Sequence, residues 1–244
     1  MLTKEKLEEK VAETNRRIPI VFNEHIANRV ADFFIDTKSY IIDLEKNPEE
    51  YFLWKSGIRA PFYCNCRNIT SNPRVTSRIS DYLAEVVEDG FPEVDSIVSL
   101  ATAGIGWGSR VSEKLGLPFG YIRSAVKEHG IKKYCEGITQ SSKNVVIIDD
   151  LVAEGGSIKN SIENLNNEFD TNILGVLSLI NWNFKKMYQN LSNNVGKIYS
   201  LTSYPHLLNS AMRRNLITEE EVEQLEHFYQ NPTKEFSFNS LKRK

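Results

Sequence analysis

Hydrophobic residues in the middle of the chain follow two spacings, that of a buried strand and that of an amphipathic helix. Short apolar runs of strand length occur at residues 96–100, 119–123, 144–149, 173–180 and 197–201. Between them, apolar residues recur three or four positions apart, as at Trp107, Val111 and Leu115 and at Ile158, Ile162 and Leu165. This alternation predicts an α/β fold, with a mostly parallel central sheet and helices on both faces.

The two ends of the chain have patterns of their own. Helical spacing at Ile26, Val30, Phe33 and Phe34, continued by Tyr40, Ile41 and Leu44, predicts that the first fifty residues are mainly helical. Aromatic residues and two turn dipeptides predict short strands around a turn at 52–67, which we call the hood. Helical patterns follow at 75–87, 205–214 and 218–229.

These patterns divide the chain into three parts. We expect an N-terminal helical extension at 1–50, a main domain at 51–232 that includes the hood and the C-terminal helices, and a polar tail at 233–244. A chain of 244 residues with 41% hydrophobic and 25% charged residues is typical of a globular protein.

Charge and hydropathy exclude several classes of partner. The net charge of -2 disfavours nucleic-acid binding by bulk charge. The longest apolar runs are too short to span a bilayer, and residues 1–10 lack the apolar core of a signal peptide. We therefore expect a cytoplasmic protein without a membrane partner.

The chain has three cysteines, Cys64, Cys66 and Cys135. This small, odd number does not suggest a disulfide framework. Cys64 and Cys66 form a C-x-C pair, but a zinc site needs about four ligands, and no second pair or histidine is near. We interpret them as two positions of a strand.

The strongest chemical signal follows the apolar run at 144–149. Two acids, Asp149 and Asp150, precede a turn with glycines at 153–157, and a helix begins there. Backbone N–H groups of such a turn bind anions, while paired carboxylates accept hydrogen bonds from hydroxyls or hold a metal through water. A ribose 5-phosphate carries both a phosphate and a diol. The alternative is a strand end with two solvated acids that cap a helix.

A second signal is the segment at 123–137, which joins two predicted strands and has little pattern. It carries several cationic residues, namely Arg123, Lys127, His129, Lys132 and Lys133. Long loops of this kind are often functional lids, and the alternative is a solvated surface loop. Small residues at 99–106 form another turn, whose spacing fits neither a dinucleotide-binding motif nor a P-loop.

These segments together resemble the type I phosphoribosyltransferases, and the hood and the K-E-H-G string at 127–130 resemble the orotate branch. The resemblance covers roughly 52–232. It implies that Asp149 and Asp150 hold the ribose, and that Lys127 is catalytic. It implies substrate contacts for residues at four places: Lys55 and Tyr63 in the hood, Arg123 and His129 in the loop, Trp182 after the strand at 173–180, and Ala153, Glu154, Gly155, Gly156 and Ser157 at the 5-phosphate.

The resemblance implies transfer of 5-phosphoribose from phosphoribosyl pyrophosphate to orotate, giving orotidine 5-monophosphate and pyrophosphate. It also implies Mg²⁺ carried by the donor without direct side-chain ligands, and a homodimer whose 123–137 loop acts in trans. The family usually has threonine and a small residue where this chain has Ala153 and Glu154. Two alternatives therefore stay open: transfer to another base, such as a purine, and a non-catalytic sensor of the donor.

Overall fold

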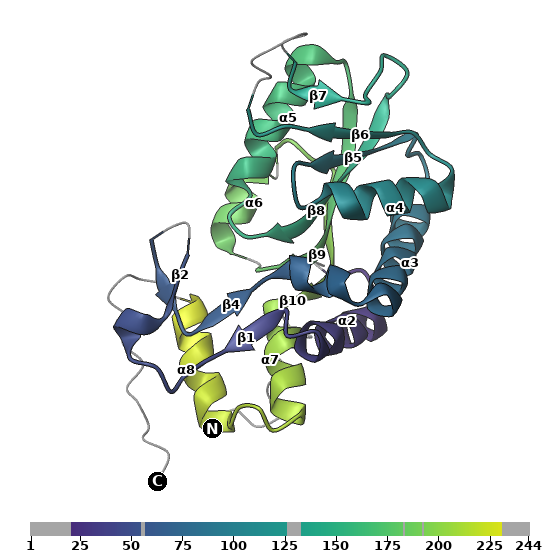
Figure 1. Cartoon of the computed structure of the whole chain (residues 1–244). Coiled ribbons are helices and arrows are strands. Elements are labelled where there is room, and N and C mark those ends of the chain that lie inside the picture. The colour runs from purple at the N-terminus through teal and green to yellow at the C-terminus, as the bar shows by residue number, and fades with distance from the viewer. Residues whose placement is uncertain (1–20, 55–56, 126–132, 183, 192, 231–244) are drawn as a thin grey trace.

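The computed structural model describes residues 21–54, 57–125, 133–182, 184–191 and 193–230. A six-stranded sheet of order β10-β9-β8-β5-β6-β7 forms its centre (Figure 1). The strands are β5 (Ser96–Leu100), β6 (Phe119–Ile122), β7 (Cys135–Glu136), β8 (Asn144–Val152), β9 (Asn172–Asn181) and β10 (Lys197–Ser203). Neighbouring strands are parallel except β7, which runs antiparallel to β6. The predicted α/β fold is confirmed.

Helices cover both faces of this sheet. One apolar core lies between the sheet and the helices α3 (Pro73–Gly90) and α4 (Ile105–Leu115), and a second lies under α5 (Gly156–Glu168) and α6 (Lys185–Leu191). Strand β8 serves both, since alternate side chains point to opposite faces. Val146 and Ile148 enter the first core, and Val145 and Ile147 the second. Burial on both faces explains why β8 reads as a continuous apolar run.

Local signals set the ends of the helices that follow the predicted patterns. Asn72 precedes α3, and its side chain accepts a hydrogen bond from the Val75 N–H at 3.3 Å. Gly116 ends α4 in the left-handed conformation, with φ of 65°. Both are residue types that favour these positions, because asparagine caps free N–H groups and glycine tolerates positive φ.

The N-terminal segment differs from the prediction. Helix α2 (Glu24–Asp36) forms, but it ends before Lys38, whose φ is 53°. Tyr40 and Ile41 therefore do not continue its apolar face as expected. They belong to β1 (Tyr40–Ile42), which pairs antiparallel with β4 (Phe62–Cys64). The pairing joins residues 20 to 24 positions apart, so helical spacing along the chain could not reveal it.

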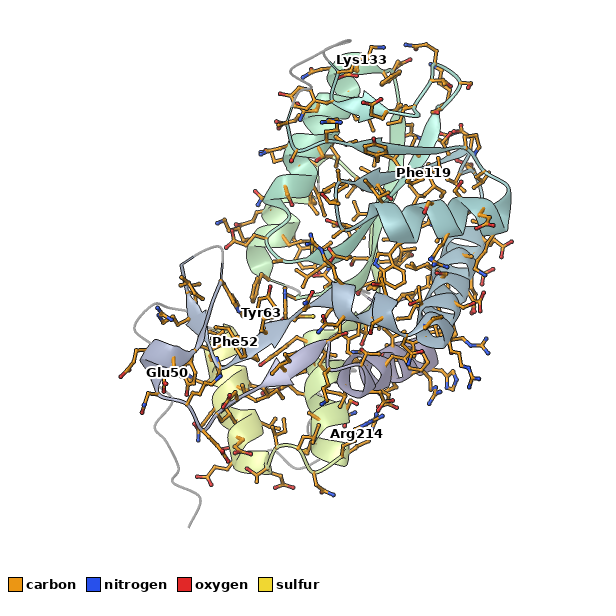
Figure 2. The ribbon with its side chains drawn as sticks, in the orientation of Figure 1. Glu50, Phe52, Tyr63, Phe119, Lys133 and Arg214 are labelled. Carbon is orange, nitrogen blue, oxygen red and sulfur yellow. The ribbon has the colours of Figure 1, made fainter. Side chains whose placement is uncertain are left out.

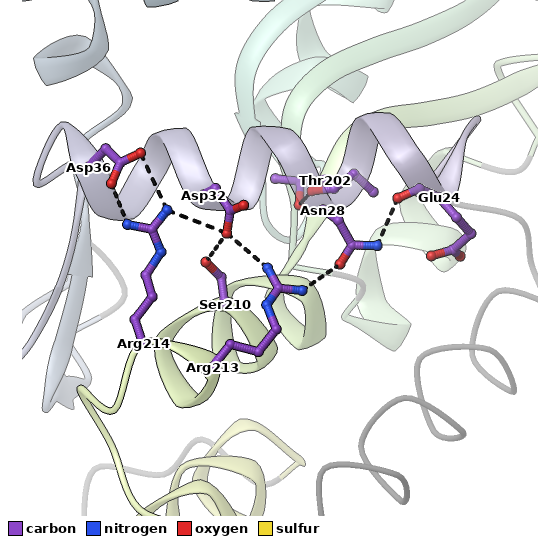
Figure 3. A network of polar contacts seen from close by, with 9 residues as sticks. Glu24, Asn28, Asp32, Asp36, Thr202, Ser210, Arg213 and Arg214 are labelled. Atoms are coloured by element: carbon purple, nitrogen blue, oxygen red, sulfur yellow. Dashed lines mark hydrogen bonds and ion pairs between the residues drawn. The ribbon is translucent and has the colours of Figure 1, made fainter.

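Helix α2 packs against β10 and against α7 (Tyr204–Arg213). Figure 3 shows the polar contacts that join α2 to α7. Asp32 accepts hydrogen bonds from Ser210 at 2.6 Å and from Arg213 at 2.8 Å, and Arg214 pairs with Asp36. These contacts attach the described part of the N-terminal segment directly to the main domain.

The hood contains the predicted pair of short strands, β2 (Phe52–Leu53) and β3 (Arg59–Ala60), followed by β4 and the start of the 3₁₀ helix η2 (Cys66–Ser71). A shorter 3₁₀ helix, η1 (Pro48–Glu50), precedes it. Beneath the hood is an aromatic cluster that includes residues of α7 and α8 (Glu219–Gln230): Trp54, Phe62, Trp182, Tyr204 and Phe228. The hood is thus held by residues from the far end of the chain.

Candidate active site

Strand β8 is longer than predicted and includes both acids. Asp149 pairs with Ser178 of β9, and the pairing continues to Val152 opposite Asn181. The apolar pattern predicted a strand that ends at Asp149, whereas β8 extends three residues further, to Val152. Leu151 and Val152 continue the pairing with β9. The two acids therefore lie inside the paired part of a central strand, where backbone hydrogen bonds hold them.

Asp149 and Asp150 are close to each other and shielded from water. Asp149 is 8% exposed, and its Oδ1 accepts a hydrogen bond from the Asp150 N–H at 2.9 Å. Burial, and then repulsion by Asp150, raise the pKa of Asp149 to about 8. Burial also raises the pKa of Asp150, against the positive charge of Arg67. The pair therefore favours ligands that stabilise its negative charge, such as hydroxyl donors or a cation.

Arg67 is a candidate site residue that the sequence analysis did not single out. It is exposed and lies in η2, and its charge acts on Asp150. The neighbouring Cys66 Sγ lies 3.7 Å from the Asp150 carbonyl oxygen, which shows that η2 packs onto the end of β8. More than eighty residues separate the two segments, and no local pattern around Arg67 signals this contact.

The turn after β8 has the backbone geometry expected of an anion-binding turn. Gly155 has φ of 73° and precedes α5, and a Cβ there would lie 2.9 Å from the Leu191 side chain. Only glycine fits without strain at such a position. At Gly156 a Cβ would meet nothing within 4 Å, so the first turn of α5 is open on that side. Its free N–H groups and the helix dipole favour a bound anion there.

Glu154, the acid in this turn, interacts with side chains of α6. Its Oε2 lies 2.6 Å from Lys186 Nζ, and its side chain is 49% exposed. Asn190 of α6 donates a hydrogen bond to the Glu154 carbonyl oxygen at 2.7 Å. The sequence analysis did not predict α6, whose side chains give Glu154 a partner within the protein. Ala153 packs at the edge of the first core.

The turn between β5 and α4 is built from small residues for a reason that the structure makes specific. A Cβ on Gly104 would lie 2.6 Å from the Ile148 carbonyl oxygen of β8. A Cβ on Gly108, in the first turns of α4, would lie 1.9 Å from the Ser99 hydroxyl oxygen of β5. At these two glycines the close approach is to the sheet itself, which brings this turn next to the end of β8.

The cationic loop is anchored at both ends. The Arg123 N–H donates to the Tyr134 carbonyl at 2.8 Å, and the Tyr134 N–H donates to Glu168 Oε1 at 2.6 Å. The Arg123 guanidinium lies 3.8 Å from Glu136. Two predicted site residues of this loop, Lys127 and His129, lie outside the described residues, as does Lys55 in the hood.

The remaining two predicted residues have contrasting surroundings. Tyr63 is 41% exposed, and its ring lies 5.6 Å from that of Phe52 on the surface of the hood (Figure 2). Trp182 is 5% exposed and lies within the aromatic cluster, with its ring 5.2 Å from that of Tyr204. An open tyrosine ring can cover a flat base, whereas the indole of Trp182 is occupied by packing.

Magnesium is the metal that the resemblance implies, and the acids fit it. Among the residues that the structure describes, no three His, Cys, Asp or Glu side chains form a cluster able to hold a metal ion. Mg²⁺ usually keeps several waters and binds through one or two carboxylates together with substrate phosphates. Asp149 and Asp150, adjacent at the open end of a strand, match that kind of partial site.

Comparison with known proteins identifies the family of this chain. A family described as "Phosphoribosyl transferase domain" matches residues 65–181. The orotate phosphoribosyltransferase of Listeria monocytogenes is 34% identical over 209 residues, covering 86% of this chain and 98% of that protein. The chain belongs to the orotate phosphoribosyltransferases. Asp149, Asp150 and the turn at 153–157 all lie inside the matched domain.

The chain also shares its fold with solved structures. The orotate phosphoribosyltransferase of Aeropyrum pernix has a TM-score of 0.64 at 22% identity, covering 78% of this chain and 99% of that one. Leishmania donovani UMP synthase has a TM-score of 0.66 at 22% identity and is matched over 42% of its length. None of the helices within the described ranges is long and apolar enough to cross a membrane.

Proposed function

We propose that this chain transfers the 5-phosphoribosyl group of phosphoribosyl pyrophosphate to orotate, releasing pyrophosphate and forming orotidine 5-monophosphate. Family membership supports the reaction. The observation that carries the proposal for the site is the pair Asp149 and Asp150 on a central strand, directly before the open first turn of α5. A ribose lying on the acids would place its 5-phosphate at that turn.

Each group of residues has a separate task in this proposal. Asp149 and Asp150 accept hydrogen bonds from the ribose hydroxyls, and the N–H groups at 153–157 hold the 5-phosphate. Tyr63 covers one face of the base. The bond from C1 of the ribose to a pyrophosphate oxygen breaks as N1 of orotate bonds to C1 and loses its proton to solvent. C1 is therefore cationic in the transition state, and negative charge grows on the pyrophosphate.

The departing charge requires cations and a site from which water is excluded. Arg123, Lys127 and His129 supply positive charge from the loop, and Lys127 is the residue that we propose as catalytic. Bound Mg²⁺ would add charge neutralisation at the donor phosphates, with Asp149 and Asp150 holding it through water. No covalent intermediate with the protein is needed.

We also propose that the chain is a cytoplasmic homodimer in which the 123–137 loop serves the partner's site. In Figure 2, Lys133 at the described end of this loop lies at the top of the molecule, away from Tyr63 of the hood. The support for a loop that acts in trans is the resemblance of the K-E-H-G string at 127–130 to the orotate branch. The test mixes inactive Lys127→Ala chains with inactive Asp149→Asn/Asp150→Asn chains. Recovered activity supports sharing, and no recovery after confirmed subunit exchange contradicts it.

The test of the reaction is a panel of bases. The protein is incubated with donor, Mg²⁺ and either orotate, uracil, hypoxanthine or guanine, and pyrophosphate release is followed. We expect release with orotate. Release with a purine alone would support transfer to another base. Donor binding without release for any base would support the sensor function that Ala153 and Glu154 keep open.

A further inference from the structure

The two cysteines of the C-x-C pair lie in contact with each other, beside Asp150. The sulfur atoms of Cys64 and Cys66 are 3.8 Å apart, and both thiols are free. Cys64 ends β4 and Cys66 begins η2. Only Asn65 separates them, at the junction of β4 and η2, and this junction leaves the sulfurs in contact.

The two thiols differ in access. Cys64 is partly exposed, whereas Cys66 is 3% exposed. The hydrogen bond with Cys64, and then burial, raise the pKa of the Cys66 thiol well above its usual range. Because Cys66 is buried, Cys64 is the thiol that a reagent from solution meets first.

The buried thiol is also in contact with the candidate active site. Cys66 Sγ lies 3.7 Å from the Asp150 carbonyl oxygen, and the next residue is Arg67, whose charge acts on the Asp150 carboxylate. A disulfide requires sulfurs about 2.05 Å apart. Closing the pair would therefore shift Cys66 toward Cys64, and with it the start of η2 that touches Asp150.

We propose that Cys64 and Cys66 form a redox modification site for low-molecular-weight disulfides, whose closure weakens donor binding at Asp150. Cys64 as thiolate attacks a sulfur of glutathione disulfide, forming a mixed disulfide and releasing one glutathione thiolate. Cys66 then loses its proton to solvent and attacks the Cys64 sulfur, releasing the second thiolate. Both thiolates take up protons, so two protein thiols are oxidised as one disulfide is reduced to two glutathione molecules.

The first measurement is the mass of the intact protein after exposure to glutathione disulfide, and it does not depend on the proposed reaction. We expect the parent to lose two hydrogen atoms and to regain them with dithiothreitol. Cys66→Ser should instead retain one glutathione on Cys64, because the resolving thiol is absent. Cys64→Ser should form no internal disulfide. Cys135→Ser is the matched control, since Cys135 is buried in β7 within the second core, and it should behave as the parent.

The second measurement is donor affinity in the reduced and oxidised proteins, by calorimetry with phosphoribosyl pyrophosphate and Mg²⁺. We expect oxidation to raise the dissociation constant of the parent roughly three- to tenfold. The affinity of Cys64→Ser should be unaffected by the same treatment. This arm rests on the proposed donor site. If the reduced parent does not bind the donor, the proposed function fails, and the mass measurement alone decides whether the modification site exists.

Three results would overturn the inference. The parent could keep all its thiols under oxidant, Cys135→Ser could lose the reaction, or the disulfide could form without a change in donor affinity. The first two contradict the modification site, and the third contradicts its link to Asp150.

Discussion

The carboxyl end of the six-stranded sheet and the hood lie against each other, yet they hold their site residues by different means. Asp149 and Asp150 belong to a strand that pairs with β5 up to Ile148 and with β9 as far as Val152, and a turn follows it. The hood has strands of two or three residues and depends on aromatic packing with α7 and α8. In the proposed site, the surface for the donor is set by backbone pairing, and the surface for the base by side-chain packing.

This difference predicts where substitutions act. At the sheet end, changing a site residue should alter chemistry and leave the fold intact, because backbone hydrogen bonds carry the structure. Under the hood, changing an aromatic residue should first alter stability, because the packing itself holds the segment in place. The four predictions below test this contrast, from the largest expected effect to the smallest.

Trp182→Ala should lower the free energy of unfolding by about 3–5 kcal/mol, the usual cost of truncating a buried tryptophan. Trp182 contacts Trp54, Phe62 and Tyr204, so its loss leaves a cavity beneath the hood. Urea denaturation measures the change.

Tyr63→Ala is the matched control for Trp182, since Tyr63 is aromatic, belongs to the hood and is largely exposed. It should change stability far less and weaken orotate binding instead. A stable Trp182→Ala protein with weakened orotate binding would show that the indole contacts the base and that the contrast between the two regions is wrong.

Lys127→Ala should fold normally and lose turnover equivalent to about 2.7–4 kcal/mol, by analogy with loss of a hydrogen-bond donor to a developing oxyanion. The described ends of this loop are joined by the hydrogen bond between Arg123 and Tyr134, which the substitution leaves in place. Steady-state pyrophosphate release measures the loss, and the thermal midpoint serves as the folding control. Turnover within a few-fold of the parent would contradict the assignment of this loop.

The sequence predicted the sheet end well because its signals are local. Four apolar residues before Asp149, and Gly155 before a helix, can be recognised within fifteen positions. It predicted less of what depends on distant partners. The length of β8 is set by β9, the strand at Tyr40 is set by β4, and Arg67 faces Asp150 only once the hood has folded onto the sheet.

Trp182 illustrates the same limit within the candidate site. Its place after β9 is compatible with contact to a ligand, and nothing nearby in the sequence indicates that Phe62 and Tyr204 surround it. Glu154 shows the opposite case. Its charge is unfavourable in a turn that we propose to bind phosphate, and only the structure shows that it pairs with Lys186 of α6.

Asp149→Asn should stabilise the free protein, with a gain that depends on pH. The folded-state pKa of about 8 lies above the ordinary 3.8, so the cost of burying the charge is absent below about pH 3.8, grows as pH rises, and is complete above about pH 8. An asparagine carries no such cost. The gain in unfolding free energy should therefore be larger at pH 9 than at pH 5, by at least about 1.4 kcal/mol, the equivalent of one pKa unit.

Urea denaturation of parent and Asp149→Asn at both pH values measures this difference. Asp170→Asn is a suitable control, because Asp170 is exposed and lies at the far end of the sheet, near Lys143. An equal gain at pH 5 and pH 9 for Asp149→Asn would show that the pKa of this carboxyl is not raised in the folded protein.

Glu154→Ala should have the smallest effect. A carboxylate 4 Å from a bound phosphate would oppose the donor by roughly 1–4 kcal/mol, depending on the local dielectric. The Glu154 carboxylate instead pairs with Lys186 on an exposed surface, where such pairs contribute about 0–1 kcal/mol. Removing it should change the donor dissociation constant by less than about tenfold, equal to 1.4 kcal/mol. Lys186→Ala is the matched control, since it frees Glu154 to turn toward the phosphate and should weaken donor binding slightly. Much tighter binding by Glu154→Ala would place the carboxylate at the phosphate and favour a donor sensor over an enzyme.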